Sequence, residues 1–114
     1  MKKNLPSDYK QFGDAESWKQ HSPTVTGLFV CYQQARDVRQ ALLGARSQAV
    51  PMQLIVSDDG STDGTADLLA EIVSAGVGHH QVLLRIGRPN LGLTAHLNEL
   101  MLHAAGDITM FFCG

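Results

Sequence analysis

The sequence predicts an α/β fold with a mostly parallel sheet of about four strands and helices on both faces. Short apolar runs rich in β-branched and aromatic residues alternate with longer segments whose apolar residues recur every three or four positions. This alternation implies right-handed crossovers, which give parallel strands covered on both sides by helices. In such sheets, ligands bind beyond the carboxyl ends of the strands.

Each element follows from the local pattern. Strands are expected over 24–32, 52–57, 81–86 and 108–113, and helices over 35–48, 65–76 and 93–106. Gly76 and Gly106 are the expected helix stops. The residues expected to share a buried helix face are Val38, Leu42 and Ala45; Leu68, Leu69, Ile72 and Val73; and Leu93, Leu97, Leu100 and Met101.

The chain of 114 residues changes character near Pro23. We expect residues 1–23 to be a polar leader. Its scattered aromatic residues could pack on the domain, it could form a short helix from Asp14, or it could remain a loose arm. Residues 24–114 are the expected domain, and the chain is long enough to bury roughly two thirds of its unfolded surface.

Composition argues against several classes of partner. A net charge of -2 and a pI near 6.2 provide no field that would attract nucleic acid or anionic lipid. Cys31 and Cys113 lie in apolar runs without metal-site spacing, which is typical of reduced, buried thiols. No apolar run reaches the roughly 18 residues of a membrane span, and residues 1–10 lack the apolar core of a signal peptide. We therefore expect a cytoplasmic location.

The most informative stretch is "VSDDGSTDGT", residues 56–65, where two acids end an apolar strand. Like charges at a buried strand end reduce stability unless something uses them. Asp58 and Asp59 are therefore candidate functional residues. Asp63, Thr62 and Thr65 instead suit a helix cap, and the glycines suit turns.

Other known loops fit this chain poorly. A calcium loop starting at Asp59 would need Glu where Ala70 stands, and would follow a helix, not a strand. The first strand is followed by "CYQQARD", which lacks the glycines of a dinucleotide fold. "GRPNLGLT" has the glycine spacing of a phosphate loop but no Lys. A phosphorylated receiver domain would place its acids after the first and third strands, whereas here they follow the second.

With this loop, the sequence resembles the family 2 glycosyltransferases of the GT-A fold over about residues 24–114. The other matching pieces are the strand ending in Tyr32, Gln48, "NLG" at 90–92 and "AAGDITMFF" at 104–112. The resemblance implies a Rossmann-like half of a GT-A domain that binds a nucleotide-diphosphate sugar, of UDP type. The parent enzyme would transfer the sugar to an acceptor hydroxyl, with inversion, in cell-envelope polysaccharide synthesis.

The resemblance also implies roles for individual residues. The backbone near Val30 and the ring of Tyr32 would meet the base, while Asp59 would accept a hydrogen bond from it. Asp58, Gly60 and Ser61 would shape the loop. Tyr32 could instead be a core aromatic residue and Asn90 a turn residue. Arg85 and Arg88 either face the diphosphate or are solvated at the surface. The predicted donor-binding residues are Val30, Tyr32, Asp58, Asp59, Ser61, Arg88 and Asn90.

Several departures from the family pattern limit the resemblance. Gln33 stands where Asn is common, and the Arg-Asn pair of the third helix reads Leu97 and Asn98. The acidic element that holds Mg²⁺ or Mn²⁺ in the family would begin where this chain ends. We therefore expect an inactive donor-binding fragment without catalytic or metal residues of its own. Apolar surface left at Phe111 and Phe112 would favour a homo-oligomer.

The histidines offer no alternative catalytic site. His79 and His80 lie in a loop, and His96 and His103 are too far apart on one helix to share a metal, so core or surface positions are expected. The alternative to a glycosyltransferase is a non-catalytic α/β binding or regulatory module that keeps the acid loop for structure.

Overall fold

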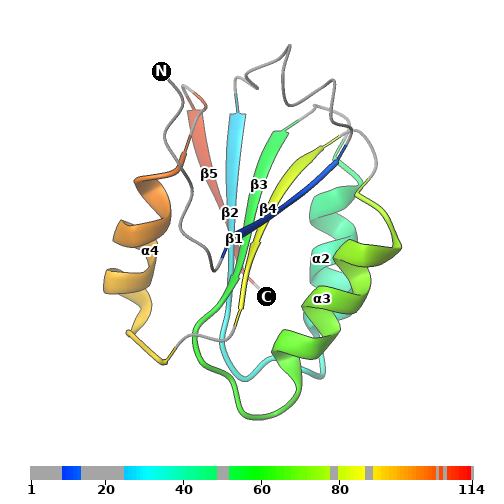
Figure 1. Cartoon of the computed structure of the whole chain (residues 1–114), viewed down its shortest axis with the longest axis vertical. Helices are drawn as coiled ribbons and strands as arrows, with labels where there is room; N and C mark the ends of the chain where they lie inside the picture. Colours follow the sequence, from blue (N-terminus) through cyan, green and yellow to red (C-terminus); the bar gives the residue numbers. More distant parts are fainter. Residues whose placement is uncertain are drawn as a thin grey trace.

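The computed structural model describes residues 9–13, 25–48, 52–77, 80–86, 89–104, 106 and 108–113. Its centre is a five-stranded sheet in the order β1-β4-β3-β2-β5 (Figure 1). The strands are β1 (Tyr9–Phe12), β2 (Val25–Cys31), β3 (Met52–Asp58), β4 (Gln81–Arg85) and β5 (Ile108–Cys113). All strand pairs are parallel except β1 with β4. The predicted α/β class and mostly parallel sheet are confirmed, with one more strand than expected.

Helices cover both faces of the sheet, as predicted (Figure 1). α2 (Val38–Arg46) and α3 (Thr65–Ala75) lie together on one face, and α4 (Leu93–Met101) lies on the other. Neighbouring strand residues point to opposite faces, so each strand contributes to two apolar clusters. Phe29, Val56 and Leu84 pack toward α2 and α3, whereas Leu28, Ile55 and Leu83 pack with Leu100 of α4. In the part of the chain described, no helix is long and apolar enough to cross a membrane.

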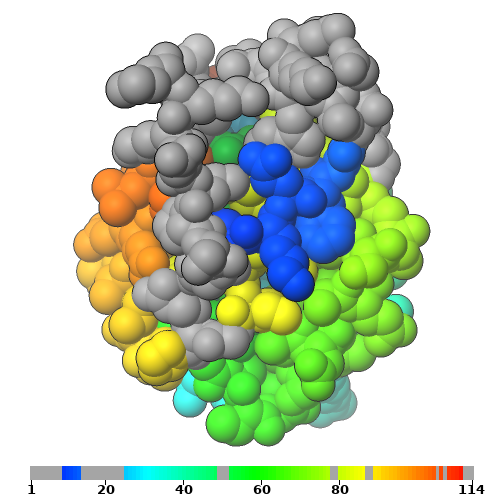
Figure 2. Space-filling model, viewed as in Figure 1, coloured from blue at the N-terminus to red at the C-terminus, as the bar shows by residue number. Residues whose placement is uncertain are grey.

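Part of the expected leader belongs to the sheet. β1 pairs antiparallel with β4, placing Tyr9 opposite Arg85 and Phe12 opposite Val82. Tyr9 is only 6% exposed and packs in the α4-side cluster, while Lys10 is exposed. Figure 2 shows β1 in blue at the surface beside the green residues of α3. The expectation of docked aromatic residues is met by Tyr9. The possible helix from Asp14 lies outside the described residues.

The expected helix faces are confirmed in α2, where Val38, Leu42 and Ala45 are buried, and largely in α3, where Leu68 is only half-buried. In α4 the prediction is confirmed for Leu100, which is buried, and for Leu97, which packs against the same cluster, but it is wrong for Leu93 and Met101, which are exposed. The helix ends at Met101, before Gly106, and buries His96 and Leu100. Leu93 is 64% exposed because it lines a cavity beyond the sheet.

Candidate functional site

The loops that follow β2, β3 and β4 meet at one end of the sheet and surround a cavity of about 480 Å³. This is the end where parallel α/β sheets bind ligands. Four predicted site residues line it: Val30, Tyr32, Asp59 and Asn90. Asp58 and Ser61 are not among the residues that line the cavity, and Arg88 lies outside the described residues. The remaining lining residues, which were not predicted, are Cys31, Gln34, Gly92 and Leu93.

Tyr32 is the most exposed aromatic side chain at the cavity. It follows the last residue of β2 and is 49% exposed. Its backbone N–H donates to Gln34 Oε1 at 3.2 Å, which holds the turn after the strand. The side chain is therefore not a core aromatic residue. Its ring face is available for stacking against a flat ligand.

Asp58 shapes the loop from inside the protein. Its side chain is 1% exposed, and it accepts hydrogen bonds from Ser61 N at 2.8 Å and from Ser61 Oγ at 2.5 Å. Gly60, with φ of 77°, supplies the left-handed turn that brings Ser61 back to the carboxylate. A buried carboxylate is stable here because donors replace its lost water.

Asp59 binds the start of α4 from a different part of the chain. Its Oδ1 accepts from Leu91 N at 2.8 Å, and its Oδ2 accepts from Gly92 N at 3.0 Å and Asn90 Nδ2 at 3.2 Å. Asn90 also donates to the Asp59 carbonyl at 3.0 Å. The carboxylate thus pairs with backbone N–H groups at the start of the helix. It also holds Asn90 and Gly92, which line the cavity, in position.

A second set of hydrogen bonds fastens the loop after β2 to the loop after β3. Gln33 N donates to Ser61 Oγ at 2.8 Å, and Gln33 Oε1 accepts from Thr62 N at 2.6 Å. Gln34 N donates to Thr65 Oγ1 at 2.9 Å. Gln33 adopts a left-handed backbone with φ of 54°, which is uncommon for a residue other than glycine or asparagine.

Asp63 joins the same two loops while satisfying the start of α3. Its Oδ1 accepts from Thr65 N at 3.1 Å, and its Oδ2 accepts from Ala35 N at 3.1 Å. The hydrogen bond from the Thr65 side chain is the main reason that the pKa of Asp63 is lowered, with the Ala35 amide next. The N-cap residue of α3 is Gly64, so the expectation that Asp63 or Thr62 caps the helix is wrong; Asp63 precedes the cap and accepts the first amide of the helix, Thr65 N.

Ser57, His96 and Asp59 form a buried polar chain behind the cavity. His96 Nε2 lies 2.5 Å from Ser57 Oγ, and His96 Nδ1 lies 3.6 Å from Asp59 Oδ1. The residue types are those of a hydrolase triad, but Ser57 and His96 are both 0% exposed. A nucleophile must reach its substrate, so the three residues Ser57, His96 and Asp59 do not form a hydrolytic site. His96 occupies one of its two expected positions, the core.

The sequence matches the family named Glycosyl transferase family 2 over residues 28–112. The chain belongs to this family. No curated protein sequence matches the chain significantly. Among solved structures, the chain is similar to a mannosyltransferase from Pyrobaculum calidifontis, PcManGT, whose structure is a complex with GDP-Man and Mn²⁺. The two share 25% sequence identity with a TM-score of 0.68, and the match covers 79% of this chain and 27% of that one.

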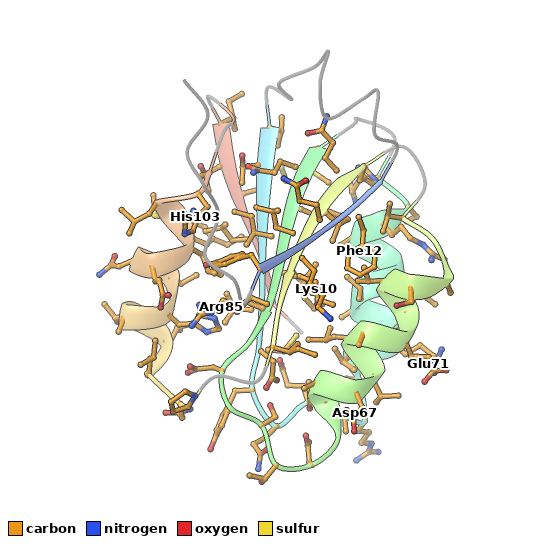
Figure 3. The ribbon with its side chains drawn as sticks, in the orientation of Figure 1. Lys10, Phe12, Asp67, Glu71, Arg85 and His103 are labelled. Atoms are coloured by element: carbon orange, nitrogen blue, oxygen red, sulfur yellow. The ribbon has the colours of Figure 1, made fainter. Side chains whose placement is uncertain are left out.

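For Arg85, both expected positions are wrong. Its side chain is 0% exposed, pairs with Glu99 at 3.2 Å and lies 5.7 Å from the centre of the Tyr9 ring. Figure 3 shows the labelled side chain on the α4 side of the sheet. Arg85 therefore joins β4 to α4 and β1, and it does not line the cavity.

The described residues of this family 2 domain do not fit a divalent cation. No group of three or more His, Cys, Asp or Glu residues converges among them. Asp58 and Asp59 already direct their oxygens to Ser61 and to the start of α4. Because Mg²⁺ and Mn²⁺ require oxygen ligands that face the ion, these carboxylates do not provide a site.

Cys31 contributes an inert wall to the cavity. It is 0% exposed, as expected for a buried thiol, and burial raises its pKa to about 12, with the Asp58 charge adding to the effect. At neutral pH the residue is therefore a protonated thiol, which is a poor nucleophile. The side chain of Cys113 lies outside the described residues.

Sequence reasoning missed Gln33, Gln34 and the link from Ser57 to His96. A signal for Gln33 was present, since it directly follows the strand-end Tyr32. Its left-handed backbone could not be read from a glutamine, because that conformation favours glycine and asparagine. The buried pair of Ser57 and His96 joins two elements that are distant in sequence, so no local pattern predicts it.

Proposed function

We propose that the chain binds a nucleotide-diphosphate sugar in the cavity at the ends of β2 and β3, as the donor-binding part of a glycosyltransferase. The observation that carries the proposal is the position of the exposed Tyr32 ring, the Asp59 carboxylate and Asn90 around one cavity. An aromatic face and a fixed hydrogen-bond acceptor are the groups that a nucleobase requires. The transfer of the sugar to an acceptor hydroxyl, with inversion, is the activity we propose for the parent enzyme.

Each part of the donor has a proposed contact. Tyr32 stacks on the base, while the backbone at Val30 borders it. A carboxylate has about four acceptor positions, and three donors already occupy those of Asp59. The remaining position suits the single ring N–H of uracil, so we propose a UDP-type donor. Arg88 is proposed to approach the diphosphate.

Donor binding without transfer is the activity we propose for these 114 residues. Asp58 and Asp59 both serve neighbouring N–H groups, so neither is available as a base for the acceptor hydroxyl. The match covers only 27% of the mannosyltransferase, and we propose that Mg²⁺ or Mn²⁺ binds to the parent enzyme through other residues. A cytoplasmic location is consistent with a nucleotide-sugar donor.

One observation favours the alternative of a non-catalytic α/β module. Asp58, Asp59 and Asp63 all hold backbone groups of neighbouring loops, so the acid loop already has a complete structural use. A module that kept this loop only for structure would have the same contacts. Binding experiments distinguish the two, because only the donor domain requires a ligand at Tyr32.

The test is an NMR titration of the labelled chain with UDP and, separately, with GDP, each with and without Mn²⁺. We expect millimolar UDP binding, near 4 kcal/mol, with little dependence on Mn²⁺. Amide shifts should concentrate at Val30, Tyr32, Asp59 and Asn90. GDP should bind more weakly, since guanine presents two adjacent donors and Asp59 has one open position.

Two variants and one control make the titration specific. Tyr32→Ala removes the half-exposed ring but keeps the backbone N–H that donates to Gln34, and it should weaken UDP binding about tenfold or more. Asp59→Ala should abolish detectable binding, through the lost acceptor and the displaced cavity wall. Asp67→Ala, an exposed acid of α3, should leave binding unchanged. Shifts located elsewhere, or equal binding by Tyr32→Ala, would favour the alternative.

A further inference from the structure

The polar chain from Ser57 through His96 to Asp59 connects the core of the sheet to the cavity wall. Ser57 lies in β3, His96 in the first half of α4, and Asp59 just beyond β3. Asp59 is 4% exposed and lines the cavity, whereas Ser57 and His96 are 0% exposed. His96 therefore contacts no ligand directly. It can act only through the carboxylate in front of it.

The surroundings of His96 determine where its proton lies. Ser57 Oγ can donate or accept, so either state of Nε2 satisfies the contact at 2.5 Å. At Nδ1 the two states differ, because this buried atom has no hydrogen-bond partner and lies 3.6 Å from Asp59 Oδ1. A bare nitrogen lone pair facing a carboxylate oxygen is repulsive, whereas an N–H is attractive. The proton therefore belongs on Nδ1, with Ser57 donating to Nε2.

Charged groups around His96 come from three elements. Asp58 and Asp59 stand at the end of β3, Arg85 lies in β4 and Glu99 lies on α4 itself. Burial is the largest effect and lowers the pKa of His96. Asp59 acts in the opposite direction, Arg85 lowers the value further, and Glu99 and Asp58 raise it. The ring is therefore neutral at pH 7, as the tautomer argument requires.

We propose that neutral His96 is a positioning residue of the cavity. Its Nδ1–H attracts Asp59 Oδ1 electrostatically across 3.6 Å, which is beyond hydrogen-bond distance, and so holds this oxygen where it receives the backbone N–H of Leu91. Oδ1 accepts from Leu91 at 2.8 Å, and Oδ2 on the same carboxylate accepts from Gly92 at 3.0 Å. Rotation of the carboxylate would release both amides and shift Asn90, Gly92 and Leu93 at the cavity. The link to donor binding rests on the proposed function, but the contact of His96 with Asp59 and the hydrogen bonds of Asp59 to Leu91 and Gly92 do not.

The first measurement concerns the ring itself. Nitrogen-15 NMR of the ring, recorded on the unmodified chain at pH 7, should show His96 with its proton on Nδ1. As the pH is lowered through the pKa of His96, the amide shifts of Leu91 and Gly92 should follow the same midpoint. A proton on Nε2 at pH 7, or Leu91 and Gly92 shifts independent of the ring titration, would overturn the proposal.

The second measurement uses a pair of variants that separate the two ring nitrogens. In His96→Asn the side-chain amide can place an N–H near the position of Nδ1, facing Asp59, whereas in His96→Gln the amide reaches toward the position of Nε2 and Ser57. Solvent exchange at Leu91 and Gly92 should remain within about twofold in His96→Asn and become about tenfold faster in His96→Gln. Equal exchange in the two variants would contradict the proposed positioning.

A control on the same helix separates positioning from general loss of stability. His103 follows α4 and contacts the Tyr9 ring at 4.6 Å between ring centroids, far along the helix from the cavity. His103→Asn should change the stability of the protein, but it should not accelerate solvent exchange of the Leu91 and Gly92 amides more than that of other amides. If a His96 variant fails to fold, the nitrogen-15 measurement of the His96 ring in the unmodified chain still tests the proposal. None of these experiments contains nucleotide, so their failure and a failure of donor binding are distinguishable.

Discussion

Each acid at the end of β3 and in the loop after it has its own hydrogen-bond donors, which explains how three carboxylates coexist within six residues. Asp58 binds Ser61, Asp59 binds the start of α4, and Asp63 binds Thr65 and Ala35. The sequence indicated that the pair Asp58 and Asp59 must be used by something, and that inference was useful. It could not reveal that the donors of Asp59 come from more than 30 positions away, because only the fold brings them together.

At the residue scale, Asp63 should make the stability of the protein sensitive to acid. Its hydrogen bonds lower its pKa in the folded protein, so the stability it contributes is present above the ordinary value of 3.8 and is lost as the pH falls through the lowered value. Asp63→Ala should unfold at lower urea concentration at pH 7 and lose part of the acid dependence below about pH 4.

Asp67→Ala is the matched control for this experiment. Asp67 lies in the first turn of the same helix and is exposed, so both variants remove one charge from the same helix end. Only Asp63 accepts the Thr65 and Ala35 amides. Urea unfolding curves that coincide for the two variants from pH 3 to pH 7 would contradict the hydrogen-bond explanation.

At the scale of elements, prediction succeeded where an element buries one continuous apolar face. α2 and the parallel strands follow their sequence patterns closely, because periodicity reports burial directly. α4 departs from its pattern because one end of the helix faces the cavity, leaving Leu93 exposed, while a histidine takes a core position. β1 was missed because four residues at a sheet edge carry too short a pattern.

The hydrogen bonds between the loops after β2 and β3 should depend strongly on Gln33. Gln33→Ala removes the contacts of the side chain with Thr62 N and Thr62 Oγ1 and should reduce the free energy of unfolding by about 1 to 2 kcal/mol. Thermal or urea unfolding measures this difference. Gln40→Ala, at an exposed position of α2, should change it by less than about 0.5 kcal/mol. Similar losses of unfolding free energy in both variants would show that the hydrogen bonds of the Gln33 side chain contribute no measurable stability.

At the scale of the whole molecule, the two outermost strands of the sheet differ in how much apolar surface they expose. β1 covers the outer edge of β4, and Tyr9 extends the cluster formed by Leu28, Ile55, Leu83 and Leu100. β5 stands last in the strand order at the opposite edge, and Ile108, Met110 and Phe111 on it are exposed. The outermost strands of the sheet are therefore β1 on one side and, on the other, β5, which presents exposed apolar side chains.

Tyr9 should be an important source of stability although it lies outside the predicted domain. Tyr9→Ala removes a side chain that is 6% exposed and should cost about 3 kcal/mol, within the range for buried aromatic residues. Lys10→Ala, the exposed neighbour on the same strand, should cost less than about 0.5 kcal/mol. A small, equal effect of both changes on urea unfolding would mean that β1 contributes little to the fold.

We propose that the β5 edge causes self-association at high concentration. Phe111 is 57% exposed and Ile108 55%, and an uncharged strand edge with apolar side chains favours pairing with another strand. Light scattering at millimolar chain should show dimers or larger assemblies, and Phe111→Lys should reduce them. Leu43→Lys, on the exposed side of α2, should not. A clean monomer of the unmodified chain at that concentration would refute the proposal.

The pairing of β1 with β4 also limits the use of the family match for choosing the boundaries of the folded domain. The family match begins at residue 28, whereas the sheet begins at Tyr9 and includes Val25 to Gly27 of β2. A polypeptide cut at the limits of the match would lack all of β1, the first three residues of β2 and the last residue of β5. Homology therefore identifies the ancestry of the sheet without marking the segment that must be synthesised for it to fold.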